Sequence, residues 1–241
     1  MKKSPVYLIF LVWLGTACGS EKDGIGSSQS TNLDSLFQVY HEYKLRINPV
    51  EATKAGEKEY NDYIANYLSD EYIEDCISNY QRFLEAINKV DTTIISSTDH
   101  ISLKAMKWDC SIKLEGLQNK IVTIPSPVFD LPHFKLMPLT QISSFQLYIG
   151  QMASGASIQP FDTVEDYKNW LKRVDDYLDW LETAQRNMKT GIQQGLVIPK
   201  ILIERTIAQL EPFANVPLEE HIFYGPVANF PQGFSDETKT F

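Results

Sequence analysis

Residues 163–181, TVEDYKNWLKRVDDYLDWL, carry the clearest helix signal in the chain. Thr163 followed by Asp166 has the spacing of a capping box, in which two side chains satisfy the first free backbone amides of a helix. We expect a helix that starts at Thr163, stops at Gly191 and buries one apolar stripe. That stripe is expected to consist of Val164, Tyr167, Trp170, Leu171, Val174, Leu178 and Leu181.

Two further amphipathic segments, residues 70–90 and 99–118, lie close together in the chain. Both repeat apolar residues at spacings of three and four, which is the period of an α-helix. Only the short polar segment 92–98 separates them. We therefore expect an antiparallel helical hairpin.

Cys76 and Cys110 lie on the two apolar stripes of this hairpin, at similar distances from the turn, so they are expected to face each other. A disulfide needs Cα atoms within about 7 Å, whereas helix axes pack about 8–10 Å apart. Two buried thiols are the favoured state, and a disulfide formed in an oxidising compartment is the alternative. The wide spacing excludes a CxxC zinc or redox motif.

The rest of the chain fits more helices joined by proline-rich segments. A first helix is expected from Asn32 to the residue before Pro49, which itself opens a short helix. Five prolines interrupt residues 121–160 and leave room for one short helix at 139–152. Pro199 opens another helix, which is expected to bury Leu202, Ile203, Ile207 and Leu210 on its inner side. The predicted fold is all-α, an irregular multi-helix array with proline-rich connecting segments.

Ser235-Asp236-Glu237 has the composition of a helix N-terminus, a capping residue followed by acids. The sequence reaches Phe241 four residues later. This pattern favours an incomplete domain, in which residues 33–241 are a truncated helical region. A frayed tail is the alternative.

The first 17 residues have the features of a signal peptide. Two lysines precede the apolar run Val6–Leu14, which is too short to span a membrane. The following Gly-Thr-Ala-Cys resembles a bacterial lipobox and predicts lipid attachment at Cys18, with an ordinary cleavage site after the alanine as the alternative. Residues 18–32 are then a lipid-anchored flexible tether. The predicted location is the bacterial cell envelope, anchored to the outer membrane on its periplasmic or surface face.

Charge and motifs exclude several functions. The net charge is −9 and no basic patch occurs, so nucleic-acid binding is not expected. His41, His100, His133 and His221 have no partners at zinc-ligand spacing, and no serine lies in a GxSxG setting. One aromatic set could line a sugar or peptide groove, although helix packing is the favoured explanation: Tyr167, Trp170, Tyr177 and Trp180.

Several short motifs follow one another in a distinctive order. They are Asn48-Pro49-x-x-Ala52-Thr53-x-x-Gly56 with Tyr60 after it, Met137-Pro138-Leu139-Thr140-Gln141, Pro160-Phe161-x-Thr163-x-x-Asp166-Tyr167 with Trp170-Leu171-x-Arg173, and Gly191-x-x-x-Gly195-x-x-x-Pro199 with Glu204-Arg205 and Gln209-Leu210. Over residues 33–231 their order and spacing resemble the DUF885 family of bacterial lipoproteins, which belongs to the gluzincin-like zinc peptidases.

The resemblance implies that this chain is the N-terminal helical portion of a longer hydrolase. The family's zinc site lies in its C-terminal half, so no catalytic, cofactor-binding or metal-binding residue is expected here, and the chain alone is expected to be inactive. The implied partners are the missing C-terminal half, a peptide-like substrate and, through Cys18, the membrane. The alternative is a complete non-catalytic helical lipoprotein that binds peptides or glycans at the cell envelope.

Overall fold

The computed structural model describes residues 24–126, 131–141 and 144–235. This part of the chain is predominantly helical, with eight α-helices and one two-stranded sheet, which confirms the predicted fold class. None of the helices described is long and apolar enough to cross a membrane. The predicted signal peptide, the lipid site at Cys18 and the helix start at Asp236 lie outside the described residues.

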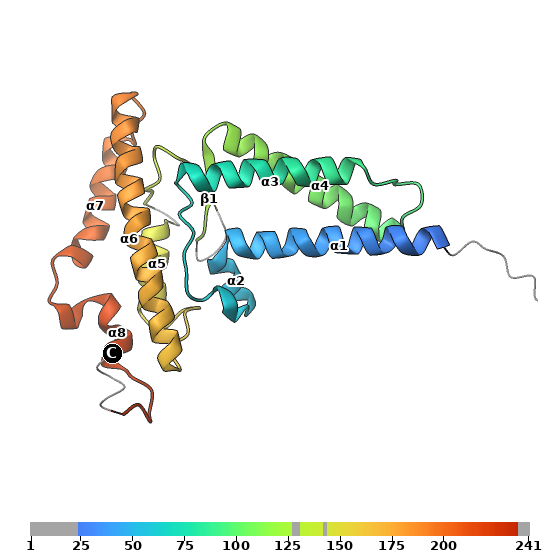
Figure 1. The fold of residues 1–241 in the computed structure, drawn as a ribbon. Coiled ribbons are helices and arrows are strands. Elements are labelled where there is room, and N and C mark those ends of the chain that lie inside the picture. Colours follow the sequence, from blue (N-terminus) through green and yellow to red (C-terminus); the bar gives the residue numbers. More distant parts are fainter. Residues whose placement is uncertain (1–23, 127–130, 142–143, 236–241) are drawn as a thin grey trace, which may run out of the picture.

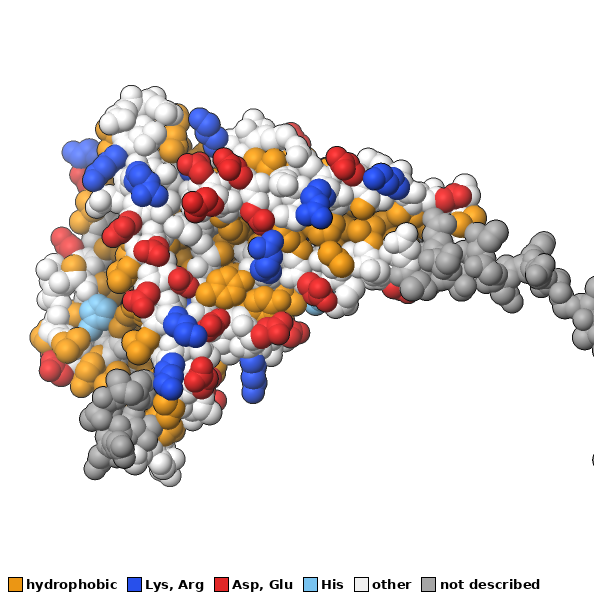
Figure 2. All heavy atoms as spheres, in the orientation of Figure 1, with side chains coloured by type: hydrophobic (Ala, Val, Ile, Leu, Met, Phe, Trp, Pro, Cys, Tyr) orange, Lys and Arg blue, Asp and Glu red, His pale blue; other side chains and the backbone are white. Residues whose placement is uncertain are grey.

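Three helices form an elongated group at one end of the molecule (Figure 1): α1 (Gly24–Ile47), α3 (Asp70–Asn88) and α4 (Ser97–Gln118). Helices α3 and α4 pack against each other as the predicted hairpin. Aromatic rings join α1 to α3, because Tyr43 meets Tyr80 edge to face with ring centroids 5.8 Å apart. Figure 2 shows apolar side chains along the junction between these two helices.

Helix α1 begins earlier than the sequence predicts. It starts at Gly24 rather than after a cap at Asn32, so residues 24–32, which the sequence analysis assigned to the tether, are helical. This stretch contains no proline. Extending an existing helix costs far less than nucleating one, so the apolar part of α1 can propagate toward the N-terminus.

The end of α1 follows the prediction. It stops at Ile47, and the side chain of Asn48 caps α2 (Pro49–Ala55) by accepting a hydrogen bond from the amide of Glu51. Gly56 ends α2 in the left-handed region at φ 91°, which glycine adopts without steric cost. A short 3₁₀ helix, η1, covers Lys58–Tyr60.

A small antiparallel sheet lies where the sequence predicted irregular structure. β1 (Ile121–Ile124) pairs with β2 (Leu131–Phe134), with Ile121 opposite Phe134. Val122 and Ile124 point into the core. Strands of four residues, one of them containing a proline, are too short for their period to stand out in the sequence.

A long helix, α6 (Val164–Gln193), crosses the end of the first group, and α5 (Phe145–Ala153) packs against it (Figure 1). The predicted capping box of Thr163 and Asp166 is present at the start of α6. The predicted stripe was partly wrong, because Leu171 and Leu178 are each 53% exposed. The buried side carries larger aromatic rings, which remove more apolar surface from water. Its members include Tyr167, Trp170, Arg173, Tyr177 and Trp180.

The last part of the described chain leaves several apolar side chains exposed to solvent. Helix α7 (Lys200–Ala214) was expected to bury Leu202 and Ile207, yet they are 37% and 52% exposed. Three short elements follow: η2 (Leu218–Glu220), η3 (Ile222–Tyr224) and α8 (Gly225–Ala228). Tyr167 of α6 holds α8 by donating a hydrogen bond to the carbonyl of Pro226.

The connection from η1 to α3 runs along α6, and a ladder of hydrogen bonds joins the two. The backbone amide of Ile64 donates to Asp176 at 2.8 Å. Further along, Asn66 donates to Thr183 at 2.9 Å, and Asn187 donates to the carbonyl of Leu68 at 3.1 Å. These bonds fix a segment that has no regular secondary structure of its own.

Arg173 is the most deeply buried charge on this ladder, at 0% exposure. Its guanidinium donates only to neutral oxygens, and burial lowers its pKa to about 10, so it stays charged at neutral pH. These acceptors come from α2, the η1 region and the segment before α6. They are the carbonyls of Pro49, Tyr60 and Tyr63 and the side chains of Thr53 and Gln159.

Replacing Arg173 should therefore destabilise the whole fold. Arg173→Met keeps the aliphatic stem but leaves several buried oxygens without donors, which predicts a loss of at least about 3 kcal/mol in unfolding free energy. Urea denaturation followed by circular dichroism measures this.

The matched control is Arg186→Met on the exposed side of the same helix. Its guanidinium makes one hydrogen bond, to Thr183, so the expected loss is at most about 1 kcal/mol. Equal stability of the two variants would contradict the structural role of Arg173.

Candidate functional site

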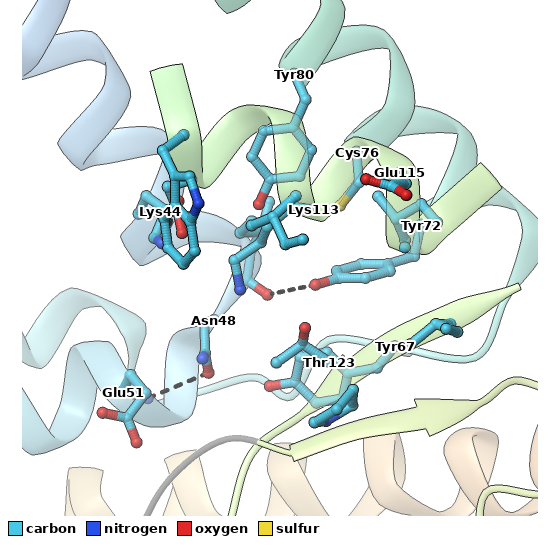
Figure 3. A pocket seen from close by; sticks show the side chains of 18 of the residues that line it. Lys44, Asn48, Glu51, Tyr67, Tyr72, Cys76, Tyr80, Lys113, Glu115 and Thr123 are labelled. Carbon is cyan, nitrogen blue, oxygen red and sulfur yellow. Dashed lines mark hydrogen bonds and ion pairs between the residues drawn. The ribbon is translucent and has the colours of Figure 1, made fainter. Parts of the chain in front are cut away.

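A cavity of about 900 Å³ lies between α1, α3, α4 and β1 (Figure 3). Its size is in the range of sites that hold a small organic molecule or a short peptide. The helical hairpin and the break at Asn48-Pro49 bring together residues that are far apart in sequence. Contributors to its wall include Lys44, Ile47, Glu51, Tyr67, Tyr72, Cys76, Tyr80, Trp108, Asp109, Lys113, Glu115, Leu117, Ile121 and Thr123.

Three tyrosines form much of the inner wall. Tyr67 is 1% exposed and Tyr80 is 2% exposed. The hydroxyl of Tyr72 donates to the carbonyl of Ile47 at 3.2 Å, and this bond ties α3 to the end of α1. The wall is therefore aromatic and largely apolar, with a few polar atoms at defined positions.

The outer part of the cavity carries an ion pair. Lys44 lies 3.0 Å from Asp109, which also accepts a hydrogen bond from the hydroxyl of Tyr40. Burial opposes ionisation of Asp109, but Tyr40 and Lys44 together outweigh it and hold the pKa of this carboxyl below its usual range. Asp109 thus remains an anion that positions Lys44 beside the cavity.

Both predicted cysteines of the core are free and buried in the structure. Cys76 lines the cavity, whereas Cys110 does not. Burial raises the pKa of Cys76, and it raises the pKa of Cys110 to about 11. Both thiols are therefore protonated at neutral pH and are poor nucleophiles.

The histidines do not gather at the cavity. His133 is 5% exposed on β2, and burial lowers its pKa, so it is neutral at pH 7. His221 accepts a hydrogen bond from the amide of Phe223, and its other ring nitrogen lies 2.9 Å from the carbonyl oxygen of Phe213. Within residues 24–126, 131–141 and 144–235, no group of three His, Cys, Asp or Glu side chains is placed to hold a metal ion.

The aromatic residues of α6 belong to the core, as the sequence analysis favoured. Tyr177 and Trp180 stack with ring centroids 5.9 Å apart, and Phe145 of α5 packs against both. Tyr167, Trp170, Tyr177 and Trp180 are all at most 9% exposed.

Sequence reasoning missed the residues that form the cavity. One signal was present: Trp108 lies off the apolar stripe of its helix, and it is 68% exposed in the structure. A large aromatic residue on the polar side of a helix can mark a contact surface. Lys44, Tyr80 and Asp109 belong to no motif, because the fold alone brings them together.

A sequence model of the family described as bacterial protein of unknown function (DUF885) matches residues 49–240. The chain belongs to the DUF885 family. The matched region of this DUF885 protein begins at the first residue of α2 and includes every element of the cavity except α1. Neither a curated protein nor a solved structure matches the chain.

Asp109→Asn should lower stability in a pH-dependent way. The carboxyl has a lower pKa folded than its ordinary value of 3.8, so its contribution is complete above that value and is lost as pH falls through the folded pKa. At pH 7 we expect a loss of about 1 kcal/mol, reduced for partial exposure.

Urea denaturation at neutral pH and near pH 3 measures the difference. Asp62→Asn, which removes an exposed pair with Lys172, serves as the control with an expected loss below about 1 kcal/mol. A pH-independent deficit for Asp109→Asn would contradict the ion-pair explanation.

Alkylation tests the state of the cysteines. In denaturant without reductant, iodoacetamide should modify both Cys76 and Cys110, because the structure holds them as thiols. In the folded protein both should be protected by burial. Tryptic peptides joined through the two residues in the native protein would instead show the disulfide alternative.

Proposed function

We propose that this DUF885 protein is the substrate-binding helical part of a lipid-anchored envelope hydrolase that resembles the zinc peptidases. In this proposal the cavity between α1, α3, α4 and β1 receives a peptide-like substrate. The lipid on Cys18 holds the protein at the membrane, and the catalytic half of the family is a separate part of the enzyme.

The observation that carries the proposal is the cavity itself. It has a volume of about 900 Å³, its inner wall is formed by Tyr67, Tyr72 and Tyr80, and the Lys44–Asp109 ion pair lies at its edge. Apolar walls with a few convergent polar groups are the usual features of a small-molecule or peptide site. A peptide has apolar side chains that can pack on the tyrosine wall and backbone groups that can hydrogen-bond to the polar side chains of the lining.

The proposal assigns no zinc chemistry to the described residues. Their acids, cysteines and histidines are not grouped as a metal would require, and His133 is enclosed in the core. These residues do not fit a zinc site, and we derive no catalytic step through the metal. Their part in the reaction is to bind and orient the substrate.

Helices α6 and α7 each leave large apolar side chains in solvent. Leu171 and Leu178 of α6, and Ile201 and Ile207 of α7, are each more than half exposed. Exposed large apolar side chains on both helices support a contact with another protein part. In the proposed enzyme that part is the catalytic half.

A second candidate is a non-catalytic envelope protein that binds glycans. The exposed ring of Trp108 beside the cavity favours it, because an indole left in solvent can stack on a flat face of a ligand. The two candidates differ in the ligand that the cavity accepts.

A cavity-filling variant tests the site. Thr123 lies on β1 and faces the cavity (Figure 3), so Thr123→Trp should place an indole in the volume that a ligand needs. Isothermal titration of the full chain with N-acetyl-leucyl-phenylalaninamide should show affinity reduced by at least about tenfold.

Thr98→Trp, at an exposed position in the first turn of α4, is the matched control. Equal affinity of the two variants would place binding elsewhere. Binding of chitotetraose but not of the peptide amide would favour the second candidate.

A further inference from the structure

We infer that Tyr80 is the specificity-determining residue of the cavity. Its hydroxyl donates a hydrogen bond to a backbone carbonyl oxygen of a bound peptide, and an apolar side chain of that peptide lies against the inner wall. This inference rests on the proposed function and names the chemistry that the cavity selects.

The surrounding structure fixes the position of the Tyr80 hydroxyl. The residue is 2% exposed, and its ring is held edge to face by Tyr43. The hydroxyl points into the cavity (Figure 3). Tyr80 is thus a rigid buried side chain that presents one polar atom to the empty volume.

Among the residues that the structure describes, none forms a hydrogen bond with this hydroxyl. It also differs from the Tyr43 hydroxyl, which is fully enclosed and unpaired, because the Tyr80 hydroxyl opens onto the cavity. The neighbouring Tyr72 hydroxyl, by contrast, bonds to the carbonyl of Ile47. A hydroxyl on an apolar cavity wall still needs a partner, which can be water or an atom of a ligand. The Tyr80 hydroxyl is therefore a donor that remains available to a ligand atom in the cavity.

The Tyr80 hydroxyl acts as the donor in a hydrogen bond to a ligand. Burial raises the pKa of Tyr80 well above its usual range, so the phenol keeps its proton at any physiological pH. The hydroxyl can therefore donate to an oxygen of the ligand. Among peptide groups, the backbone carbonyl is the abundant acceptor.

The charges around the cavity favour a neutral carbonyl over a carboxylate. The lining has two cations, Lys44 and Lys113, against three acids, Glu51, Asp109 and Glu115. Lys44 is already paired with Asp109. A ligand carboxylate near Tyr80 would be buried in a lining with an excess of negative charge, which is unfavourable.

The wall beyond Tyr80 is suited to an apolar side chain. Tyr67 is almost fully buried, and Leu117 and Ile121 complete this surface. Removing a large apolar side chain from water against such a wall contributes most of the affinity. The Tyr80 hydroxyl then distinguishes between apolar ligands, because only a ligand with an acceptor oxygen beside it forms the hydrogen bond.

The experiment compares Tyr80→Phe with Tyr43→Phe in the full chain. Both changes remove one hydroxyl from the same aromatic cluster, but only Tyr80 lines the cavity. Isothermal titration with N-acetyl-leucyl-phenylalaninamide should show affinity about three- to tenfold weaker for Tyr80→Phe, and unchanged for Tyr43→Phe. Naphthalene, which has no acceptor, should bind Tyr80→Phe as tightly as the unmodified protein.

Unchanged peptide affinity in Tyr80→Phe overturns the role of the hydroxyl while leaving the proposed function in place. An equal loss of naphthalene affinity makes Tyr80 a packing residue and also overturns the inference. A peptide amide that fails to bind the unmodified protein overturns the proposed function and the inference together.

Discussion

The buried guanidinium of Arg173 joins parts of the chain that share no secondary structure. It satisfies backbone oxygens at Pro49, Tyr60 and Tyr63, and the ladder of hydrogen bonds that follows along α6 fixes the next residues up to Leu68. Tyr67, which walls the cavity, is held within that ladder. The shape of the candidate site thus depends on a cation that does not line it.

Helices with a strong period were predictable from the sequence, because amphipathic spacing and caps are local properties. The hairpin of α3 and α4 and the capping box at Thr163 are the best examples. Which side of α6 would be buried was not predictable by hydropathy alone. Its aromatic side contains Arg173, and the acceptors that make this burial tolerable come from residues 49–63, more than a hundred positions away.

The site was less predictable than the fold. Cys76 could be placed on a buried stripe, but the cavity beside it is lined from α1, α2, α3, α4, β1 and β2, and no local pattern specifies their relative positions. The short strands were missed for a similar reason, since β1 is recognisable only by its pairing with β2. Family membership, by contrast, was readable from the ordered motifs and is confirmed over residues 49–240.

The large sequence separation between Arg173 and its acceptors also determines the order in which these parts of the chain can form contacts. Its acceptors at Pro49 and Tyr63 precede it by 124 and 110 residues. At ribosomal rates of about 5–20 residues per second, these segments emerge roughly 6–25 s before the helix that binds them. Before α6 is present, the α3–α4 hairpin and the aromatic contacts between α1 and α3 can already form. Closing so long a loop makes the docking of α6 a late step in folding.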